Sequence, residues 1–253
     1  MNLRNYYWYF KSAIPERICD DIVKYGHQLQ DQMAVTGGYG HQKLNKKQTK
    51  DLKSAIPERI CDDIVKYGHQ LRDQMAITGG FGGSKKLNKE QITDLKKKRN
   101  SNIVWMDDRW IYKEIQPYVK EANINAGWNF DWDWSESCQF TKYKKGQYYD
   151  WHCDSFNSPY FNKENPQDPT NGKIRKLSVT VTLSDPKDYK GGELEFDFRD
   201  LDPDKKPNIK KCTEILSKGS LVVFPSFVRH RVCPVKSGER NSLVIWNLGY
   251  PFK

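Results

Sequence analysis

Two of the five histidines in this 253-residue chain lie in its second half, where their neighbours could form a common site. His152 precedes Asp154 by two residues, within the run DWHCD. On an extended chain these two side chains point to the same face, while Cys153 points away. His230 follows SLVVFPSF, a run typical of a buried strand. Two imidazoles and one carboxylate on one face leave positions open opposite them, as in the facial triads of non-haem Fe(II) oxygenases.

One basic residue could bind an anionic partner of such a metal. Arg240 follows His230 by ten residues, within SGERNSLVIWNLG. At that spacing, a strand returning through the core can direct the guanidinium into a pocket beside the metal. A buried guanidinium needs an anion, and a dicarboxylate cosubstrate would supply one through bidentate hydrogen bonds.

The elements that must position these residues are short strands. From residue 128 onward the chain alternates between apolar and polar residues in SCQFTKY, KLSVTVTL, GGELEFDF, GSLVVFP and NSLVIWNL. Several short strands at this spacing predict a β-sandwich or jelly roll. Residues 109–126 precede them and predict a helix in spite of Pro117. Helices followed by strands indicate a β core with a helical flank.

An internal repeat dominates the N-terminal part. KSAIPERICDDIVKYGHQL occurs identically at 11–29 and 53–71, and its apolar residues recur at helical spacing. Each copy therefore predicts an amphipathic helix packed on the side of the fold. Repeat arrays normally need about three or more units, so two near-identical copies indicate a recent tandem duplication. Residues 6–10 and 103–105 read as strands entering and leaving the repeat, and one copy would suffice to connect them.

Composition excludes some classes of protein. Hydrophobic residues make up 37% of the chain, and no run approaches the roughly 20 apolar residues that span a bilayer. The formal charge of +10 permits nucleic acid as a partner, but we interpret the basic runs as solvated helix faces and loops. We find no basic–aromatic cluster in the half that carries His152. The six cysteines form no CxxC pair and no secretory signal precedes them, so we expect free thiols in a reducing compartment.

Three runs together resemble the prolyl 4-hydroxylase-like branch of the Fe(II)/2-oxoglutarate dioxygenases, especially its bacterial and phage-borne versions. They are QFTKYKKGQYYDWHCD, RKLSVTVTLSDPKDYKGGELEF and GSLVVFPSFVRHRVCPVKSGERNSLVIW. The resemblance implies an α+β protein with a double-stranded β-helix (jelly-roll) core, flanking N-terminal helices and one helical unit tandemly duplicated. Residues 99–253 would form the dioxygenase domain. Residues 1–98 would form an N-terminal strand plus the repeat units 11–52 and 53–96.

The resemblance also implies the catalytic residues and their cofactors. His152, Asp154 and His230 would be the Fe(II) ligands. Arg240 would hold the distal carboxylate of the cosubstrate 2-oxoglutarate, at a position where collagen-type members use Lys. O₂ would be the second cosubstrate, and L-ascorbate is a candidate cofactor.

Further residues have an implied role and a plainer structural alternative. Tyr143 would hydrogen-bond the cosubstrate, or be an ordinary strand aromatic. Ser178 would lie beside the same carboxylate, or belong to the polar face of its strand. Trp246 would line the substrate pocket, or pack in the core. The loop that contains Tyr160 and Phe161 would close over the substrate, or be a flexible insertion.

The implied reaction hydroxylates a peptidyl residue, with proline as the first candidate, and converts 2-oxoglutarate and O₂ to succinate and CO₂. The substrate would be a peptide or protein, and the location the cytoplasm, that of the host cell if the chain is phage-encoded. One alternative is an oxidative demethylase of nucleic-acid bases from the same superfamily. Another is a catalytically silent binding or structural module on the oxygenase fold. The oligomeric state stays open.

Overall fold

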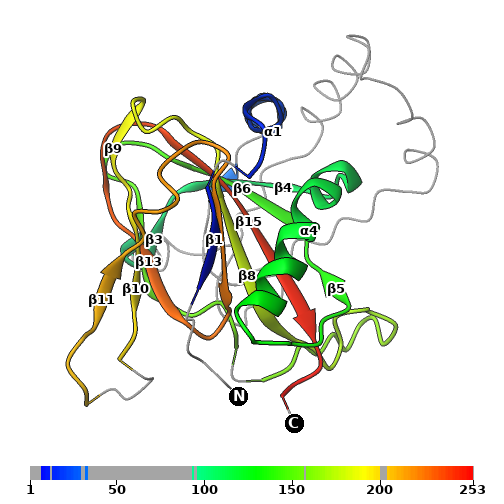
Figure 1. The fold of residues 1–253 in the computed structure, drawn as a ribbon. Helices are drawn as coiled ribbons and strands as arrows, with labels where there is room; N and C mark the ends of the chain where they lie inside the picture. The colour runs from blue at the N-terminus through cyan, green and yellow to red at the C-terminus, as the bar shows by residue number, and fades with distance from the viewer. Residues whose placement is uncertain are drawn as a thin grey trace, which may run out of the picture.

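The computed structural model describes residues 7–11, 13–29, 32–33, 93, 96–156, 158–199 and 204–252. These residues form mostly antiparallel β-sheet, accompanied by helices α1 (Glu16–Gln28) and α4 (Arg109–Asn125) (Figure 1). The predicted β core with a helical flank is confirmed at this level. The second repeat copy at 53–71 lies outside the described residues, so the duplicated helical unit stays a prediction.

The larger sheet carries most of the predicted strands. Its order is β1–β12–β8–β15–β6–β4–β2, with β5 paired to the end of β15, and all pairs are antiparallel. The strands are β1 (Trp8–Phe10), β2 (Gln32–Met33), β4 (Asn102–Met106), β5 (Trp134–Ser135), β6 (Cys138–Tyr143), β8 (Ile174–Thr182), β12 (Leu221–Pro225) and β15 (Arg240–Gly249). Pairing of Trp8 with Val223 joins the N-terminus of the chain to its C-terminal half.

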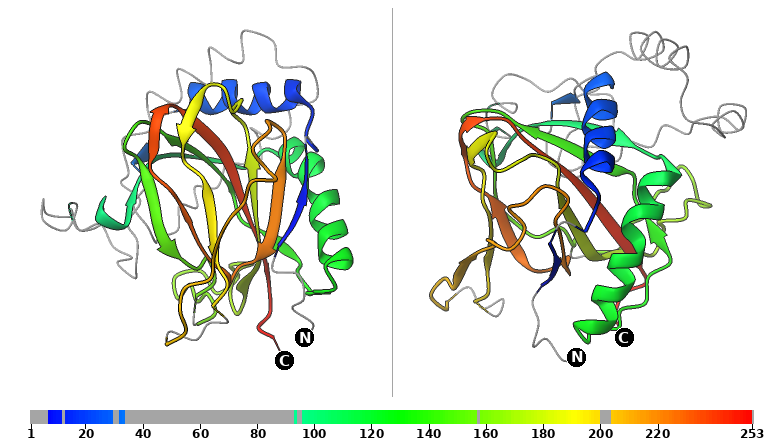
Figure 2. Two further views of the ribbon diagram at one scale, coloured as in Figure 1. Left: turned by 60° about the vertical axis from the view of Figure 1, so that its left-hand side comes forward. Right: turned by 45° about the horizontal axis from the view of Figure 1, so that its top comes forward.

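A smaller sheet lies beside the larger one. It has the order β11–β10–β13–β7–β3, and a separate pair joins β14 to β9. The strands are β3 (Arg99–Asn100), β7 (Tyr148–His152), β9 (Tyr189–Gly191), β10 (Leu194–Asp197), β11 (Ile209–Lys211), β13 (Arg229–Val232) and β14 (Val235–Gly238). In Figures 1 and 2 the larger sheet lies between this smaller sheet and α4, and α1 crosses one end of the strands.

The two faces of the larger sheet have different chemistry, as β8 shows. Leu177, Val179 and Val181 pack in one buried cluster with residues of α1 and α4. The alternate residues carry hydroxyls, point to the opposite face and are also buried. They are Ser178, Thr180 and Thr182. The space between the two sheets therefore has a partly polar lining, whereas the helix side is apolar.

Helix α4 confirms the helix predicted at 109–126. Ile111, Ile115, Val119 and Ala122 recur every three or four residues and are completely buried against the sheet. Pro117 lies on the opposite, exposed side of the helix, where losing one backbone hydrogen bond is tolerated. No helix among the described residues is long and apolar enough to cross a membrane.

Candidate metal centre

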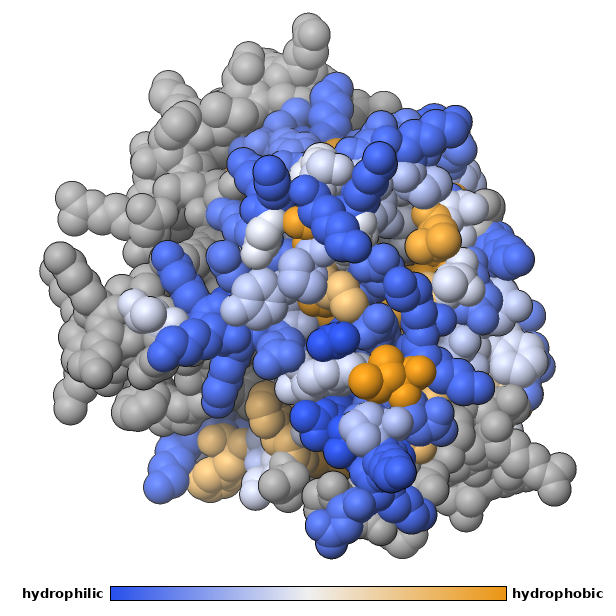
Figure 3. Space-filling model, turned by 90° about the vertical axis from the view of Figure 1, so that its left-hand side faces the viewer, coloured by the Kyte–Doolittle hydropathy of each residue, from blue (hydrophilic) through white to orange (hydrophobic). Residues whose placement is uncertain are grey.

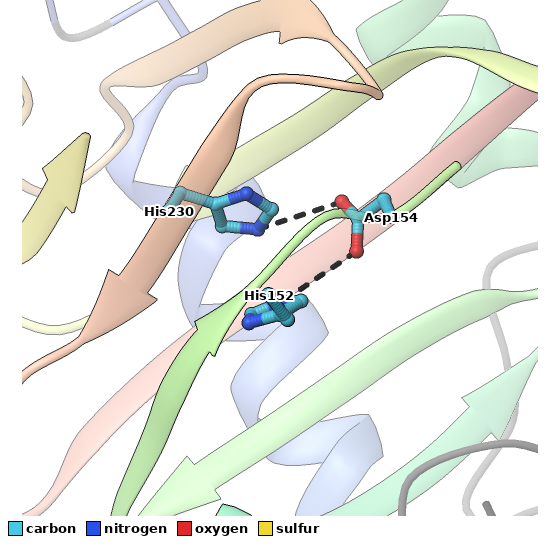
Figure 4. Close-up of side chains that lie close together, drawn as sticks. All are labelled: His152, Asp154 and His230. Atoms are coloured by element: carbon cyan, nitrogen blue, oxygen red, sulfur yellow. Dashed lines mark ion pairs between the residues drawn. The ribbon is translucent and has the colours of Figure 1, made fainter. Parts of the chain in front are cut away.

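Three side chains that are separated by up to 78 residues meet between the sheets. His152 ends β7 and pairs with His230 of β13 across the smaller sheet, and Asp154 follows two residues later. The backbone N–H of Asp154 donates to the carbonyl of Ser226 at 2.9 Å, which fixes the turn after β7. Figure 4 shows both imidazoles directed at the Asp154 carboxylate. The expected same-face placement of His152 and Asp154 is confirmed.

The geometry of this group suits a metal ion. One ligand atom from each residue lies within 4.8 Å of the others. Nε2 of His152 and Nε2 of His230 each lie 3.6 Å from a different Asp154 oxygen. The Nδ1 atoms of the two rings face the carbonyls of Asp150 at 2.7 Å and Val228 at 2.9 Å. Since a carbonyl only accepts, both Nδ1 atoms carry a proton, and Nε2 is in each ring the nitrogen directed at the centre.

The protonation states also fit a divalent cation. Burial would raise the pKa of Asp154, but the imidazoles of His230 and His152 hold it well below its usual range. Burial and the neighbouring His152 lower the pKa of His230 to about 4. A carboxylate that stays ionised and an imidazole that stays neutral are the forms that bind metal.

Aromatic rings fix the orientation of the two imidazoles. Tyr149 stacks on His152 with ring centroids 3.5 Å apart. Phe224 meets His230 edge-on at 4.8 Å, and Phe196, which contacts Phe224, lies 6.2 Å from the same imidazole. Rings held in this way lose little further freedom when they bind a metal, which favours a preformed site.

Arg240 is buried next to Tyr143, as a cosubstrate pocket would require. It is 2% exposed and pairs with Tyr143 across β15 and β6, with its guanidinium carbon 5.6 Å from the tyrosine ring. Its Nη1 donates to Ser242 Oγ at 3.1 Å. Among the described residues no carboxylate pairs with Arg240, and a buried charge of this kind is stabilised by an anion.

Ser178 is placed differently from the expected partner of that anion. It is completely buried, and its hydroxyl lies 2.9 Å from the hydroxyl of Ser226. Ser226 is also the residue whose carbonyl accepts from Asp154. The observed hydrogen bond therefore connects Ser178 to the turn that carries Asp154, and its contact with the cosubstrate stays a prediction.

A second cluster adjoins the triad and includes two residues that sequence reasoning missed. Arg175 donates from Nε to Glu136 Oε1 at 2.7 Å, and its guanidinium carbon lies 3.8 Å from the centroid of a Trp246 ring. Tyr160 donates its hydroxyl to the same Glu136 oxygen at 2.9 Å. The charge of Arg175 also contributes to lowering the pKa of Asp154, so this cluster acts on the metal centre. In the sequence, the signal that could have identified Glu136 and Arg175 was the presence of a charged residue at the end of a buried strand.

The loop between Asp154 and Arg175 is internally bonded. Tyr160 N donates to the Lys173 carbonyl at 2.9 Å, and Asn162 Nδ2 donates to Asp168 Oδ2 at 3.0 Å. Its adjacent aromatic residues Tyr160 and Phe161 diverge, since Tyr160 is 8% exposed and Phe161 is 75% exposed. Of these two residues, Tyr160 belongs to the cluster around Trp246 and Phe161 does not. Whether the loop closes over a substrate or is a flexible insertion stays a prediction.

The expectation that this half of the chain has no basic–aromatic cluster is wrong. The guanidinium carbons of Arg229 and Arg231 lie 5.9 and 4.6 Å from the Trp151 ring centroids, on the outer face of the smaller sheet. Figure 3 views the molecule from the side of the smaller sheet, and hydrophilic side chains cover most of this surface. Strands β7 and β13 are far apart in sequence, so only their pairing brings these residues together. Arg231 is also paired with Glu195 at 2.8 Å, which reduces the net charge of the cluster.

Comparison with known proteins relates the C-terminal half to one family. Residues 138–247 match the family model of the 2OG-Fe(II) oxygenase superfamily. A PKHD-type hydroxylase of Shewanella baltica is 36% identical over 108 residues, which are 42% of this chain and 40% of that protein. A second one, of Maricaulis maris, is 41% identical over 75 residues, 30% of each protein. The chain thus matches less than half the length of these curated relatives.

A solved structure extends the similarity to the fold of the whole chain. The viral collagen prolyl hydroxylase of Paramecium bursaria Chlorella virus-1, in its 2OG complex, aligns over 97% of both chains with a TM-score of 0.53. The sequences are 18% identical, so this similarity concerns the fold alone.

Proposed function

We propose that this protein, whose residues 138–247 belong to the 2OG-Fe(II) oxygenase superfamily, is an Fe(II)- and 2-oxoglutarate-dependent dioxygenase that hydroxylates a peptidyl residue, with proline as the target. The observation that carries the proposal is the convergence of His152, Asp154 and His230, whose ligand atoms lie within 4.8 Å of one another. The sequence similarity to PKHD-type hydroxylases over the same part of the chain supports the reaction class.

His152, Asp154 and His230 would hold the metal. Their two neutral nitrogens and one ionised oxygen suit Fe(II) and leave coordination positions open. Bound Fe(II) would couple the oxidative decarboxylation of 2-oxoglutarate, to succinate and CO₂, with insertion of one oxygen atom into the substrate. The chain's own part is to orient the ligands, through the carbonyls that accept from Nδ1 and the aromatic rings around the imidazoles.

Arg240 would bind the distal carboxylate of 2-oxoglutarate. Its burial, with no carboxylate partner among the described residues, supports this role, because an uncompensated buried charge is costly until an anion binds. Tyr143 faces the same guanidinium and would hydrogen-bond the cosubstrate. Ser178 would contribute its hydroxyl near the same carboxylate, and L-ascorbate would keep the iron reduced.

Trp246, Tyr160 and Phe161 would contact the peptide. Trp246 and Tyr160 belong to one cluster next to the triad, and Arg175 and Glu136 extend it with a charged pair. The indole N–H of Trp246 finds no acceptor among the described residues. Exposed Phe161 lies in the loop that would close over the bound peptide.

The organisation of the chain follows from the same proposal. The two sheets would be the halves of a double-stranded β-helix within a dioxygenase domain of residues 99–253, and residues 1–98 would hold the entering strand and the duplicated unit. We further propose a cytoplasmic location, supported by the five described cysteines, all of which are free thiols.

The experiment is an anaerobic titration of the protein with Fe(II) and 2-oxoglutarate, following the weak visible charge-transfer band of the chelated cosubstrate. The band should appear, His152→Ala should abolish it, and Arg240→Ala should shift its appearance to higher 2-oxoglutarate concentration. Proline-containing peptides are then screened for the gain of one oxygen atom, with succinate measured in parallel and with and without ascorbate. Absence of the band in metal-loaded protein would reject the cosubstrate and favour the silent module.

A nucleic-acid base is a second candidate substrate, favoured by the arginine pair on Trp151. Aromatic rings flanked by arginines are used to stack and neutralise single strands. Binding of a single-stranded oligonucleotide that weakens steeply with salt, and is lost in Trp151→Ala, would favour this substrate over a peptide.

A further inference from the structure

The surface beneath α1 is specific for the sequence of the repeat. We call this surface the helix seat and define it by Tyr118, Phe140, Lys218, Gly219 and Glu239. These residues come from α4, β6, the turn before β12 and the turn before β15. They are therefore far apart in the sequence, and the completed sheet brings them under one helix.

The start of the repeat is held through backbone atoms. Ile14 N donates to the Gly219 carbonyl at 2.8 Å, and Tyr118 donates its hydroxyl to the Ala13 carbonyl at 2.7 Å. A Cβ atom at Gly219 would collide with the Ile14 carbonyl oxygen, so the chain approaches as closely as glycine permits. Ile14 itself is 1% exposed.

The middle of α1 fits the seat by shape. Cys19 and Ile22 are completely buried in the cluster shared with the larger sheet. One turn later Gly26 lies directly against the Phe140 ring, and a Cβ atom there would collide with that ring. The repeat thus carries glycine at the position where the sheet leaves no room for a side chain.

One ion pair and one histidine–carboxylate contact add to the fit. Lys218 pairs with Asp20, and Nε2 of His27 lies 3.7 Å from Glu239 Oε1. Each pair joins one end of the helix to a different turn of the seat. A helix must therefore present an acidic residue and a histidine seven positions apart to satisfy both turns.

Every one of these features occurs a second time in the chain. Residues 53–71 are identical to residues 11–29, and the three differences between the aligned stretches 11–40 and 53–82 all follow Leu29. The equivalents of the residues in contact with the seat are Ala55, Ile56, Cys61, Asp62, Ile64, Gly68 and His69. From these contacts we propose that the helix seat accepts either copy of the repeat, with residues 55–71 as its alternative occupant within the same molecule.

The chain is long enough for the exchange. With residues 55–71 in the seat, residues 11–54 would connect them to β1 and residues 72–98 would connect them to β3. The shorter connection has 27 residues, which span up to about 90 Å when extended. The entropy of closing loops depends only logarithmically on their length, so identical contacts leave a small difference between the two arrangements. The first copy is favoured because it continues directly from β1.

The test uses matched substitutions in the two copies. Ile22→Asp and Ile64→Asp each place a carboxylate on the buried face of one copy. Each single variant should melt within about 4 °C of the unmodified protein, because the other copy fills the seat. The double variant should melt lower by about 10 °C or more, since no apolar face remains for the seat. A full decrease in Ile22→Asp alone, or none in the double variant, would overturn the proposal.

Two controls test whether the buried face of the repeat causes the effect and whether the occupant of the seat belongs to the same molecule. The pair Arg17→Gln and Arg59→Gln removes an exposed i,i+4 ion pair, at a side chain that is 79% exposed in the first copy, and should change the melting temperature by only about 2 °C or less. The melting temperature of Ile22→Asp should not depend on protein concentration. A rise with concentration would assign the occupant to a second molecule and overturn exchange within the chain.

A crosslink reports the exchange directly. In the Ile22→Asp background, Asp62→Cys and Lys218→Cys should be joined by a short bifunctional thiol reagent, and the linked peptides identified by mass. The same two cysteines in the Ile64→Asp background should not be joined. Equal crosslinking in both backgrounds, or none in either, would contradict the proposed exchange.

Discussion

The two faces of the larger sheet differ in chemistry and in the role that follows from it. The face toward α1 and α4 is apolar, with Phe140 and Val179 fully buried in its cluster. The opposite face carries Ser178 and Arg240 and is directed toward the smaller sheet, which holds the two histidines of the candidate metal site. Both faces are buried, so burial alone does not distinguish them. The apolar face stabilises the fold by close packing. The polar face destabilises it, because burying polar groups costs free energy, but those groups can bind a metal and an anion.

The sharpest way to separate the faces is to remove a group from the polar space. His152→Ala should abolish turnover and metal binding, because two ligands do not hold Fe(II) in the open facial arrangement. The melting temperature without metal should change little. Turnover and the charge-transfer band are the measurements, and Cys153→Ala, which changes the exposed side chain next to His152, is the control that should retain both. Turnover in His152→Ala would remove His152 from the metal site.

A substitution on the apolar face should affect stability and leave the metal site intact. Phe140→Ala should lower the free energy of unfolding by about 3–5 kcal/mol, because the ring is completely buried and packs against Gly26. Denaturant unfolding measures this loss, and Phe140→Leu should cost less. The folded fraction should still show the charge-transfer band. Loss of the band in fully folded Phe140→Ala would show that the two faces are not independent.

Arg240 tests whether the polar face binds an anion. Arg240→Ala should raise the KM for 2-oxoglutarate about 30-fold or more, equivalent to at least about 2 kcal/mol, because the carboxylate loses its buried partner. Arg240→Lys retains the charge but not the planar fork, and should have a smaller effect. Steady-state assays across 2-oxoglutarate concentrations give both values. An unchanged KM in Arg240→Ala would place the cosubstrate elsewhere.

The smallest effect is expected at Ser178, which lies on the same strand as Val179 but on the other face. Ser178→Ala should lower the free energy of unfolding by about 1 kcal/mol, since it removes one hydrogen bond to Ser226. If Ser178 also contacts the cosubstrate, the KM for 2-oxoglutarate rises as well. A stability change with an unchanged KM would limit Ser178 to holding the turn that carries Asp154.

Much of the architecture could be predicted from local patterns. The spacing of Ile111, Ile115 and Val119 predicted α4, and the alternation around Val179 predicted β8. The pair His152 and Asp154 could be recognised as well, because neighbours on an extended chain share a face. The basic–aromatic group on Trp151 was missed, since its arginines come from a different strand.

The second cluster, around Arg175 and Trp246, could not be predicted from local sequence patterns. Glu136 and Arg175 are 39 residues apart, and each is an ordinary charged residue in its own segment. Their pairing, and the stacking of Arg175 on Trp246, depend on how β5, β8 and β15 are aligned. Tyr160 and Phe161 are adjacent aromatic residues, yet only the fold of their loop sends one inward and the other to solvent.

The sequence by itself determined the helical and strand periods, the identity of the two repeat copies and the chemical types available at the metal site. These properties depend on residues within a few positions of one another, whose geometry is set by backbone conformation. Only the tertiary structure decided that His230 pairs with His152, that Arg240 is buried with no carboxylate partner among the described residues, and that the helix seat receives the first copy of the repeat. These outcomes depend on strand register, which is fixed when distant segments pack together to bury their apolar faces.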